Sequence, residues 1–172
     1  MPRDQTDTLI IGAGLSGLHA ASLLGKAGKD VLLVEARARL GGRVHSPESG
    51  GGRYDLGPSW FWPEVNPRLR RLVEELNLGS FPQYSDGGAL FEAPGRAIER
   101  QSYSFGGSPA SWRIAGGALS LVDAMKNGIP EGNILTGSQV TEVRQTEHGV
   151  EIEMNRLNGK MRIEASKVIF AL

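Results

Sequence analysis

Three glycines near the start of the chain have the spacing of a phosphate-binding turn. Gly12, Gly14 and Gly17 separate an apolar run at residues 8–11 from a segment rich in alanine and leucine. The first glycine permits a sharp turn out of a strand, the second lets a pyrophosphate approach the backbone, and the third lets a helix pack closely on the sheet. The start of such a helix offers free N–H groups and a positive dipole end to phosphates. The predicted diphosphate site comprises Gly12, Gly14, Leu15, Ser16 and Gly17.

A glutamate after the second apolar run, residues 31–34, indicates which dinucleotide the turn would bind. Glu35 is placed to accept hydrogen bonds from both hydroxyls of a ribose, and its charge would repel a 2′-phosphate. NADP is therefore disfavoured, and NAD or FAD remains. The glycines alone are also explained by a tight turn with close helix packing, so the prediction depends on the glycines and the glutamate together.

The segment after Glu35 favours FAD over NAD. Residues 36–43 contain three arginines and a glycine pair, and they lack the apolar periodicity of a second nucleotide-fold helix. Gly41 and Gly42 permit close backbone approach, and Arg43 offers a planar fork of donors to a phosphate oxygen. We therefore predict FAD as the cofactor.

These residues make the chain similar to the flavin-containing amine oxidase family, which includes monoamine and polyamine oxidases. The resemblance is strongest over residues 7–60, which include the sequence from Tyr54 to Trp60, and it resumes over 112–172. It implies an α/β, Rossmann-like FAD-binding domain with a parallel sheet and an antiparallel β-meander, plus the start of a substrate domain. The implied domain order is a first FAD-binding segment at 1–59, a partial substrate-domain excursion at 60–113 and a second FAD-binding segment at 114–172.

The resemblance also extends the predicted cofactor site. The residues it adds are Ala36 and Arg37 on the ribose side, Gly57, Pro58, Ser59 and Trp60 along the flavin, and Val140 at the adenine. Val140 is equally compatible with a β-branched residue packed in a strand. The aromatic run Trp60, Phe61 and Trp62 is equally compatible with core side chains at a domain junction. We expect Arg39 to be a surface charge.

Periodicity and turn signals predict the elements that would position these residues. Helices are expected at 67–78 and 117–127, and a small hairpin between residues 81 and 98. Strands are expected at 133–136, 138–145, 150–155, 160–165 and 168–172, with a tight turn at Asn158-Gly159.

The activity that the resemblance implies is oxidation of an amine by oxygen, through the flavin, to an imine and hydrogen peroxide. The chain offers no clear acid, base or nucleophile, so the catalytic residues stay unknown. We expect His19 to be a surface or packing residue and leave His45 unassigned, and the spacing of histidines and carboxylates predicts no metal site. Two alternatives stay open: a desaturase- or protoporphyrinogen-oxidase-like flavoenzyme acting on a carbon–carbon bond, and a non-catalytic nucleotide-binding module.

Composition limits the partners. Nineteen basic and nineteen acidic side chains give zero formal charge, which predicts no binding to nucleic acid or to an anionic membrane. The absence of cysteine excludes disulfides and a cysteinyl flavin link within this chain. The apolar runs are too short to cross a bilayer and no secretory signal pattern is present, so we expect a cytoplasmic protein.

Length suggests an incomplete enzyme. Members of the family are usually much longer than these 172 residues, so we expect an N-terminal portion, as a fragment, a truncated product or one subunit of a split enzyme. An amine substrate would then require the missing chain, and these residues alone would show no turnover. The apolar strand at 168–172 would favour self-association or pairing with a complementing C-terminal portion.

Overall fold

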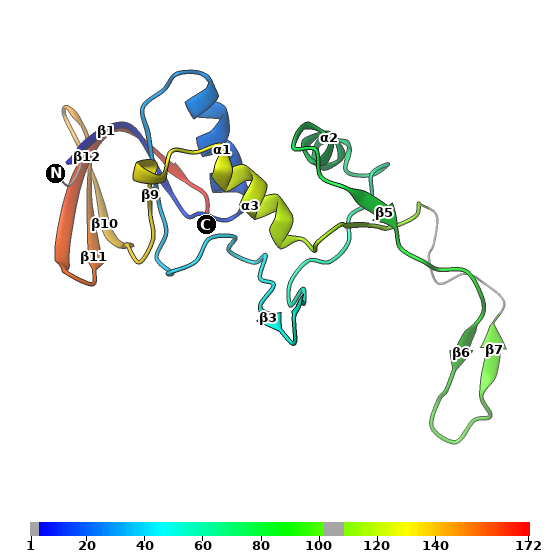
Figure 1. Ribbon diagram of the computed structural model, residues 1–172. Coiled ribbons are helices and arrows are strands. Elements are labelled where there is room, and N and C mark those ends of the chain that lie inside the picture. Colours follow the sequence, from blue (N-terminus) through cyan, green and yellow to red (C-terminus); the bar gives the residue numbers. More distant parts are fainter. Residues whose placement is uncertain (1–3, 102–108) are drawn as a thin grey trace.

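A six-stranded mixed sheet organises the chain (Figure 1). The computed structural model describes residues 4–101 and 109–172. The strands lie in the order β10, β11, β12, β1, β2, β9. Their bounds are β1 (Gln5–Ile11), β2 (Val31–Val34), β9 (Ile134–Leu135), β10 (Gln139–Thr146), β11 (Gly149–Arg156) and β12 (Gly159–Phe170). Strands β12, β1, β2 and β9 are parallel, whereas β10, β11 and β12 are antiparallel. The predicted α/β architecture with a parallel sheet and a meander is confirmed.

Strand β12 belongs to both parts of the sheet. From Gly159 to Ala165 it pairs antiparallel with β11, and from Glu164 to Phe170 it pairs parallel with β1. The prediction of two separate strands, at 160–165 and 168–172, was wrong. The polar residues Ser166 and Lys167 lie at exposed positions, and a polar side chain facing solvent does not interrupt backbone pairing.

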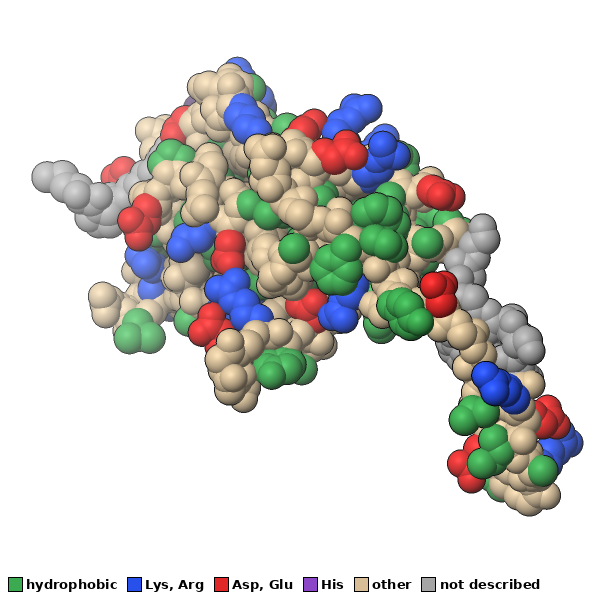
Figure 2. Space-filling model, turned by 45° about the vertical axis from the view of Figure 1, so that its right-hand side comes forward, with side chains coloured by type: hydrophobic (Ala, Val, Ile, Leu, Met, Phe, Trp, Pro, Cys, Tyr) green, Lys and Arg blue, Asp and Glu red, His purple; other side chains and the backbone are tan. Residues whose placement is uncertain are grey.

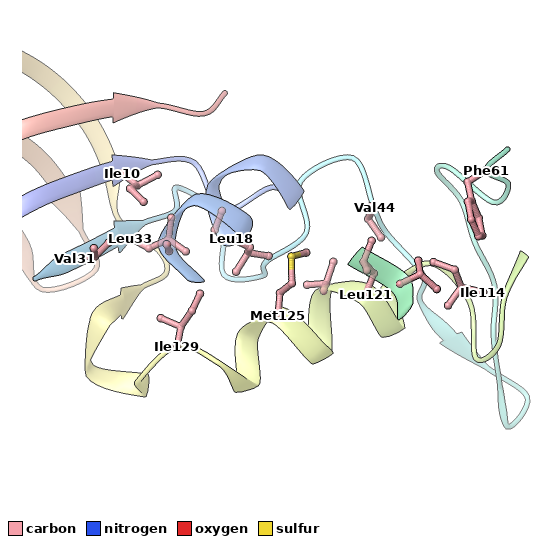
Figure 3. Close-up of a cluster of buried hydrophobic side chains, with 14 residues drawn as sticks. Ile10, Leu18, Val31, Leu33, Val44, Phe61, Ile114, Leu121, Met125 and Ile129 are labelled. Atoms are coloured by element: carbon pink, nitrogen blue, oxygen red, sulfur yellow. The ribbon is translucent and has the colours of Figure 1, made fainter. Parts of the chain in front are cut away.

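Each face of the parallel sheet has its own hydrophobic core. Ile10 and Leu33 point to the face covered by helices α1 (Leu15–Lys26) and α3 (Leu119–Asn127), where Met125 is buried among them (Figure 3). Their neighbours Leu9 and Leu32 point to the opposite face, because side chains alternate along a strand. That face is covered by the meander through Ile152, Met154 and Ile163. The end of β1, from Leu9 to Ile11, and the whole of β2 are therefore apolar at successive positions.

The second core makes the meander a structural part of the nucleotide fold. We expect Ile152→Ala to lower the free energy of unfolding by about 2–4 kcal/mol, because the side chain is fully buried and leaves a cavity. Urea denaturation followed by circular dichroism measures the change. Leu157→Ala, in the exposed turn before β12, is the control and should shift stability by less than about 0.5 kcal/mol. Equal effects of the two substitutions would contradict the packing of the meander on the sheet.

Outside the sheet lie short elements that connect β2 to α3. They are β3 (Glu48–Ser49) paired with β4 (Gly52–Arg53), helix α2 (Pro67–Glu75), β5 (Ser80–Pro82) paired with β8 (Trp112–Ile114), and β6 (Ala89–Phe91) paired with β7 (Glu99–Gln101). A 3₁₀ turn, η1 (Glu131–Asn133), precedes β9. Figure 2 shows the β6–β7 hairpin projecting from the rest of the molecule, and Leu90 and Ile98 on it are exposed. No helix in the described ranges has both the length and the apolar character needed to cross a membrane.

Both predicted helices of this region are shorter than expected. Helix α2 ends at Glu75 rather than at 78, because Asn77 takes a left-handed conformation with φ of 53°. Helix α3 begins at Leu119 rather than at 117, because Gly116 and Gly117 have positive φ angles. The structure contains a hairpin in the predicted region, but with different bounds. It is formed by β6 and β7, whereas Phe81 lies outside it and pairs with Arg113 in β8.

Candidate dinucleotide site

The loops after β1, β2 and β9 meet at one edge of the sheet. Strands β2 and β9 lie on one side of β1 and the later strand β12 lies on the other, so the strand order reverses beside β1. The carboxyl end of β1 is therefore at a topological switch point, where open α/β sheets bind ligands. Backbone hydrogen bonds join the loops: Gly12 N–H donates to the Val34 carbonyl at 2.8 Å and Ser138 N–H to the Glu35 carbonyl at 2.9 Å. The glycine turn and Glu35 are thereby held side by side.

Glu35 is almost fully buried and its carboxylate is fixed at both oxygens. Oε2 accepts a hydrogen bond from Ala13 N–H and Oε1 accepts one from Arg37 N–H, each at 2.9 Å. Its exposed fraction is 7%. Each carboxylate oxygen keeps a further lone pair, so the group could still accept bonds from two hydroxyls. The main chain of the glycine turn therefore orients the predicted ribose ligand.

Of the three turn glycines, Gly12 and Gly17 are required by the fold itself. Gly12 has φ of 102°, and a Cβ there would lie 2.5 Å from the Ala171 carbonyl oxygen. A Cβ on Gly17 would overlap the Gly12 carbonyl oxygen. These contacts fit the predicted roles of a sharp turn and close helix packing.

Gly14 is different, because the described chain gives no reason for a glycine there. Its φ of −70° suits any residue, and apart from its chain neighbours no described atom lies within 4 Å of a Cβ built on it. The space beside Gly14 is therefore open. Open space at this position is expected if the glycine serves to let a bound ligand approach the backbone.

The glycine pair at 41–42 packs against this turn. Gly41 N–H donates to the Ala13 carbonyl at 2.8 Å, and a Cβ on Gly42 would lie 3.1 Å from Gly14 Cα. Both glycines have positive φ. The segment that this pair approaches closely is therefore the glycine turn. Arg43 comes directly after the pair and is exposed. A contact of these residues with a phosphate stays a prediction.

A cavity of about 260 Å³ brings Val140 to the same site. It lies between the ends of β1 and β2 and the start of β10, and Gly12, Glu35 and Val140 line it. A bulge between Val140 and Glu142 interrupts the β10 ladder here, and bulges redirect side chains. Val140 also packs on the meander core, so both interpretations of this residue hold geometrically. Its contact with adenine stays a prediction.

A larger cavity, of about 730 Å³, lies beside α3, and none of the predicted cofactor residues lines it. Arg39, which we expected to be a surface charge, borders this cavity and is half-exposed. Its Nη1 donates to the carbonyls of Leu40 and Val44 at 3.2 and 3.4 Å. Ala36 and Arg37, by contrast, are exposed. Gly12 and Glu35 line the smaller cavity and do not line the larger one, so the smaller cavity is the one that adjoins the predicted dinucleotide residues.

The segment from Gly57 to Trp60 lies against Arg43. A Cβ on Gly57 would overlap the Arg43 carbonyl oxygen. Pro58 is exposed, and Ser59 donates to the Gly57 carbonyl at 3.4 Å. Trp60 is 54% exposed and donates through Nε1 to Gln83 Oε1 at 3.1 Å.

The aromatic run divides between the two interpretations. Phe61 is buried and belongs to the core (Figure 3), whereas Trp60 and Trp62 are largely exposed. Flavin contacts of the segment stay predictions. His19 and His45 are both half-buried, and neither belongs to the glycine turn.

Sequence reasoning missed three residues that hold the site together. Ala13 uses only its main chain, so its residue type carries no signal. Ser138 is 1% exposed and its hydroxyl donates to the Thr136 carbonyl at 3.1 Å. The preceding residue, Gly137, has a positive φ and marks the turn. Asp55 accepts hydrogen bonds from Ser46 and from the start of α3, a contact between distant segments that no local pattern shows.

Comparisons with known proteins agree with this geometry. The family model of an NAD(P)-binding Rossmann-like domain matches residues 10–76. The chain is 37% identical over 95 residues to the probable flavin-containing monoamine oxidase A of Dictyostelium discoideum, covering 55% of this chain and 21% of that protein. It is 38% identical over 90 residues to the putrescine oxidase of Kocuria rosea, covering 52% and 19%. It is also 46% identical over 64 residues to the carotenoid 3,4-desaturase of Haloarcula japonica, covering 37% and 13%.

The fold is shared with a solved putrescine oxidase structure that contains putrescine. The TM-score is 0.84 at 20% sequence identity, and the match covers 99% of this chain and 59% of that one. The aligned regions thus span about a fifth or less of the length of the curated relatives.

Proposed function

Because the chain belongs to the flavin-containing amine oxidase family and corresponds to its N-terminal FAD-binding portion, we propose that it binds FAD at the carboxyl ends of β1 and β2. The observation that carries the proposal is the open space beside Gly14, next to a glutamate whose carboxylate is already oriented. Gly12 and Gly17 serve the fold, so Gly14 is the position that needs a ligand to explain it.

The residues present fit the parts of FAD in order along the site. Free N–H groups at the start of α1 would hold the diphosphate, since no described side chain caps that helix. Glu35 would hold the ribose, and the cavity beside Val140 would receive the adenine. Gly42 adjoins Gly14, and Arg43 adjoins Gly57, so the second half of a dinucleotide would extend toward the 57–60 segment.

We further propose that the whole protein oxidises an amine with oxygen to an imine and hydrogen peroxide. When bound, FAD supplies the redox chemistry of that reaction. The residues described here bind and orient the cofactor, and the proposal of an amine substrate is supported by the names of the curated relatives, a putrescine oxidase and monoamine oxidases among them.

A carbon–carbon oxidation is the second candidate. It is supported by the identity of 46% over 64 residues to the carotenoid 3,4-desaturase. The two classes can be separated by adding either amines or a polyene to the FAD-loaded whole protein in the absence of oxygen. Loss of the flavin absorbance with amines but not with the polyene supports the amine oxidase, and the reverse supports the carbon–carbon oxidation.

Direct titration tests cofactor binding by this chain. We expect FAD and ADP to bind, and ADP carrying a 2′-phosphate to bind much more weakly, because Glu35 would face the added charge. Isothermal titration calorimetry measures all three ligands. Binding of ADP without any gain for FAD would favour the non-catalytic nucleotide module, and binding of neither would overturn the proposal.

A further inference from the structure

The side chain of Asp55 joins its own segment to Ser46 and to the start of α3, which is distant in the sequence. Oδ1 accepts a hydrogen bond from Ser46 Oγ at 2.6 Å, and both carboxylate oxygens lie within 3.3 Å of Ala118 N–H at the start of α3. Ser46 is 4% exposed. Gly117 has φ of 85°, and a Cβ there would lie 3.0 Å from Oδ1, so the glycine makes room for the carboxylate.

One of the segments joined by Asp55 carries the predicted flavin-side residues, Gly57 to Trp60. Main-chain hydrogen bonds already align the segments of Asp55 and Ser46, from Leu56 N–H to the His45 carbonyl at 2.9 Å and from Tyr54 N–H to the Pro47 carbonyl at 3.1 Å. Arg43 lies just before one segment, and Gly57 lies in the other, packed on the Arg43 carbonyl.

Helix α3 provides a fixed point for this pair of segments. Leu121, Val122 and Met125 bury its inner face in the core under the sheet. The Asp55 carboxylate therefore connects the 43–46 and 55–60 segments to the main core through the first turn of α3. Hydrogen bonds from two donors, Ser46 Oγ and Ala118 N–H, to one half-buried carboxylate limit how far these segments can shift.

We propose that Asp55 is a positioning residue for the flavin end of the cofactor. The inference rests on the proposed function. Gly14, Glu35 and Val140 are held at the strand ends without Asp55, so they and the ADP half they would contact are independent of it. Only a ligand that reaches past Gly42 toward the 57–60 segment depends on Asp55.

Comparing FAD with ADP tests this role. We expect Asp55→Ala to weaken FAD binding roughly tenfold and to leave ADP within about twofold, by the usual worth of buried charge-assisted hydrogen bonds. Ser46→Ala, which removes one donor, should show the same selectivity with a smaller loss. Asp55→Asn keeps one acceptor for Ala118 N–H and should recover part of the affinity.

Thr146→Ala is the matched control, because Thr146 Oγ1 donates to the Gly149 carbonyl in the meander, away from both halves of the site. It should change neither affinity. Calorimetric titration gives the affinities, and thermal unfolding without ligand reports folding. If Asp55→Ala does not fold, the test is made with Ser46→Ala, by comparing its loss of FAD affinity with its loss of ADP affinity.

Two results would overturn the inference: an equal loss of FAD and ADP affinity, which indicates general destabilisation, and no loss of either. Failure of the unsubstituted chain to bind FAD or ADP would instead overturn the proposed function. The two failures are therefore distinguishable.

Discussion

We expect Gly14→Val to abolish the binding of both FAD and ADP and to leave the chain folded. The valine side chain would occupy the open space beside the turn, where the diphosphate is proposed to lie. The φ of −70° and the extended ψ at this position are normal for valine, so no backbone strain accompanies the change. Calorimetric titration measures binding, and far-UV circular dichroism with thermal unfolding measures folding.

Gly17→Ala is the contrasting variant at the same turn. A single methyl group there meets the Gly12 carbonyl, so this substitution should lower the unfolding temperature before any ligand is added. Normal FAD binding by Gly14→Val would mean that Gly14 is only part of a turn. A large loss of stability in that variant would mean that the space beside it is not open in solution.

The sequence predicts this turn well because its determinants are local. Gly12 has a φ of 102° in a strand-to-helix connection and Gly17 packs on the Gly12 carbonyl, and these two constraints act within a few residues along the chain. The close approach of Gly12 to the Ala171 carbonyl, by contrast, is a contact between distant residues. The apolar runs of β1 and β2 are likewise explained by two neighbouring layers, the helices and the meander. Patterns of this kind can be recognised without knowing the rest of the fold.

Contacts between distant segments are what the sequence does not reveal. Strand β5 pairs with β8 across the intervening β6–β7 hairpin, and the apolar pattern of Phe81 would suit a nearer partner equally well. The role of Asp55 depends on where α3 begins, which Gly116 and Gly117 determine through their positive φ. Likewise, the Gly41–Gly42 pair can be recognised as a site of close approach, but its partner in this chain is the glycine turn.

We expect Glu35→Gln to weaken the binding of FAD and ADP by roughly ten- to a hundredfold, from the loss of about 1.5–3 kcal/mol when a charged acceptor is replaced. The structure adds a second effect. The carboxylate accepts from Ala13 N–H and Arg37 N–H, and a glutamine must turn its NH₂ group toward one of these two donors. The glycine turn should therefore also be held less firmly, and the unfolding temperature should fall.

A ligand without ribose hydroxyls separates the two effects of Glu35. For the unsubstituted chain, 2′,3′-dideoxy-ADP should bind more weakly than ADP, because it cannot donate to the carboxylate. For Glu35→Gln the two ligands should become nearly equal, and any loss that remains for the dideoxy ligand measures the disturbance of the turn. Glu131→Gln, at an exposed position, should bind like the unsubstituted chain. If ADP and its dideoxy form bind the unsubstituted chain equally, Glu35 does not contact the ribose, and its carboxylate serves only to fix the Ala13 peptide.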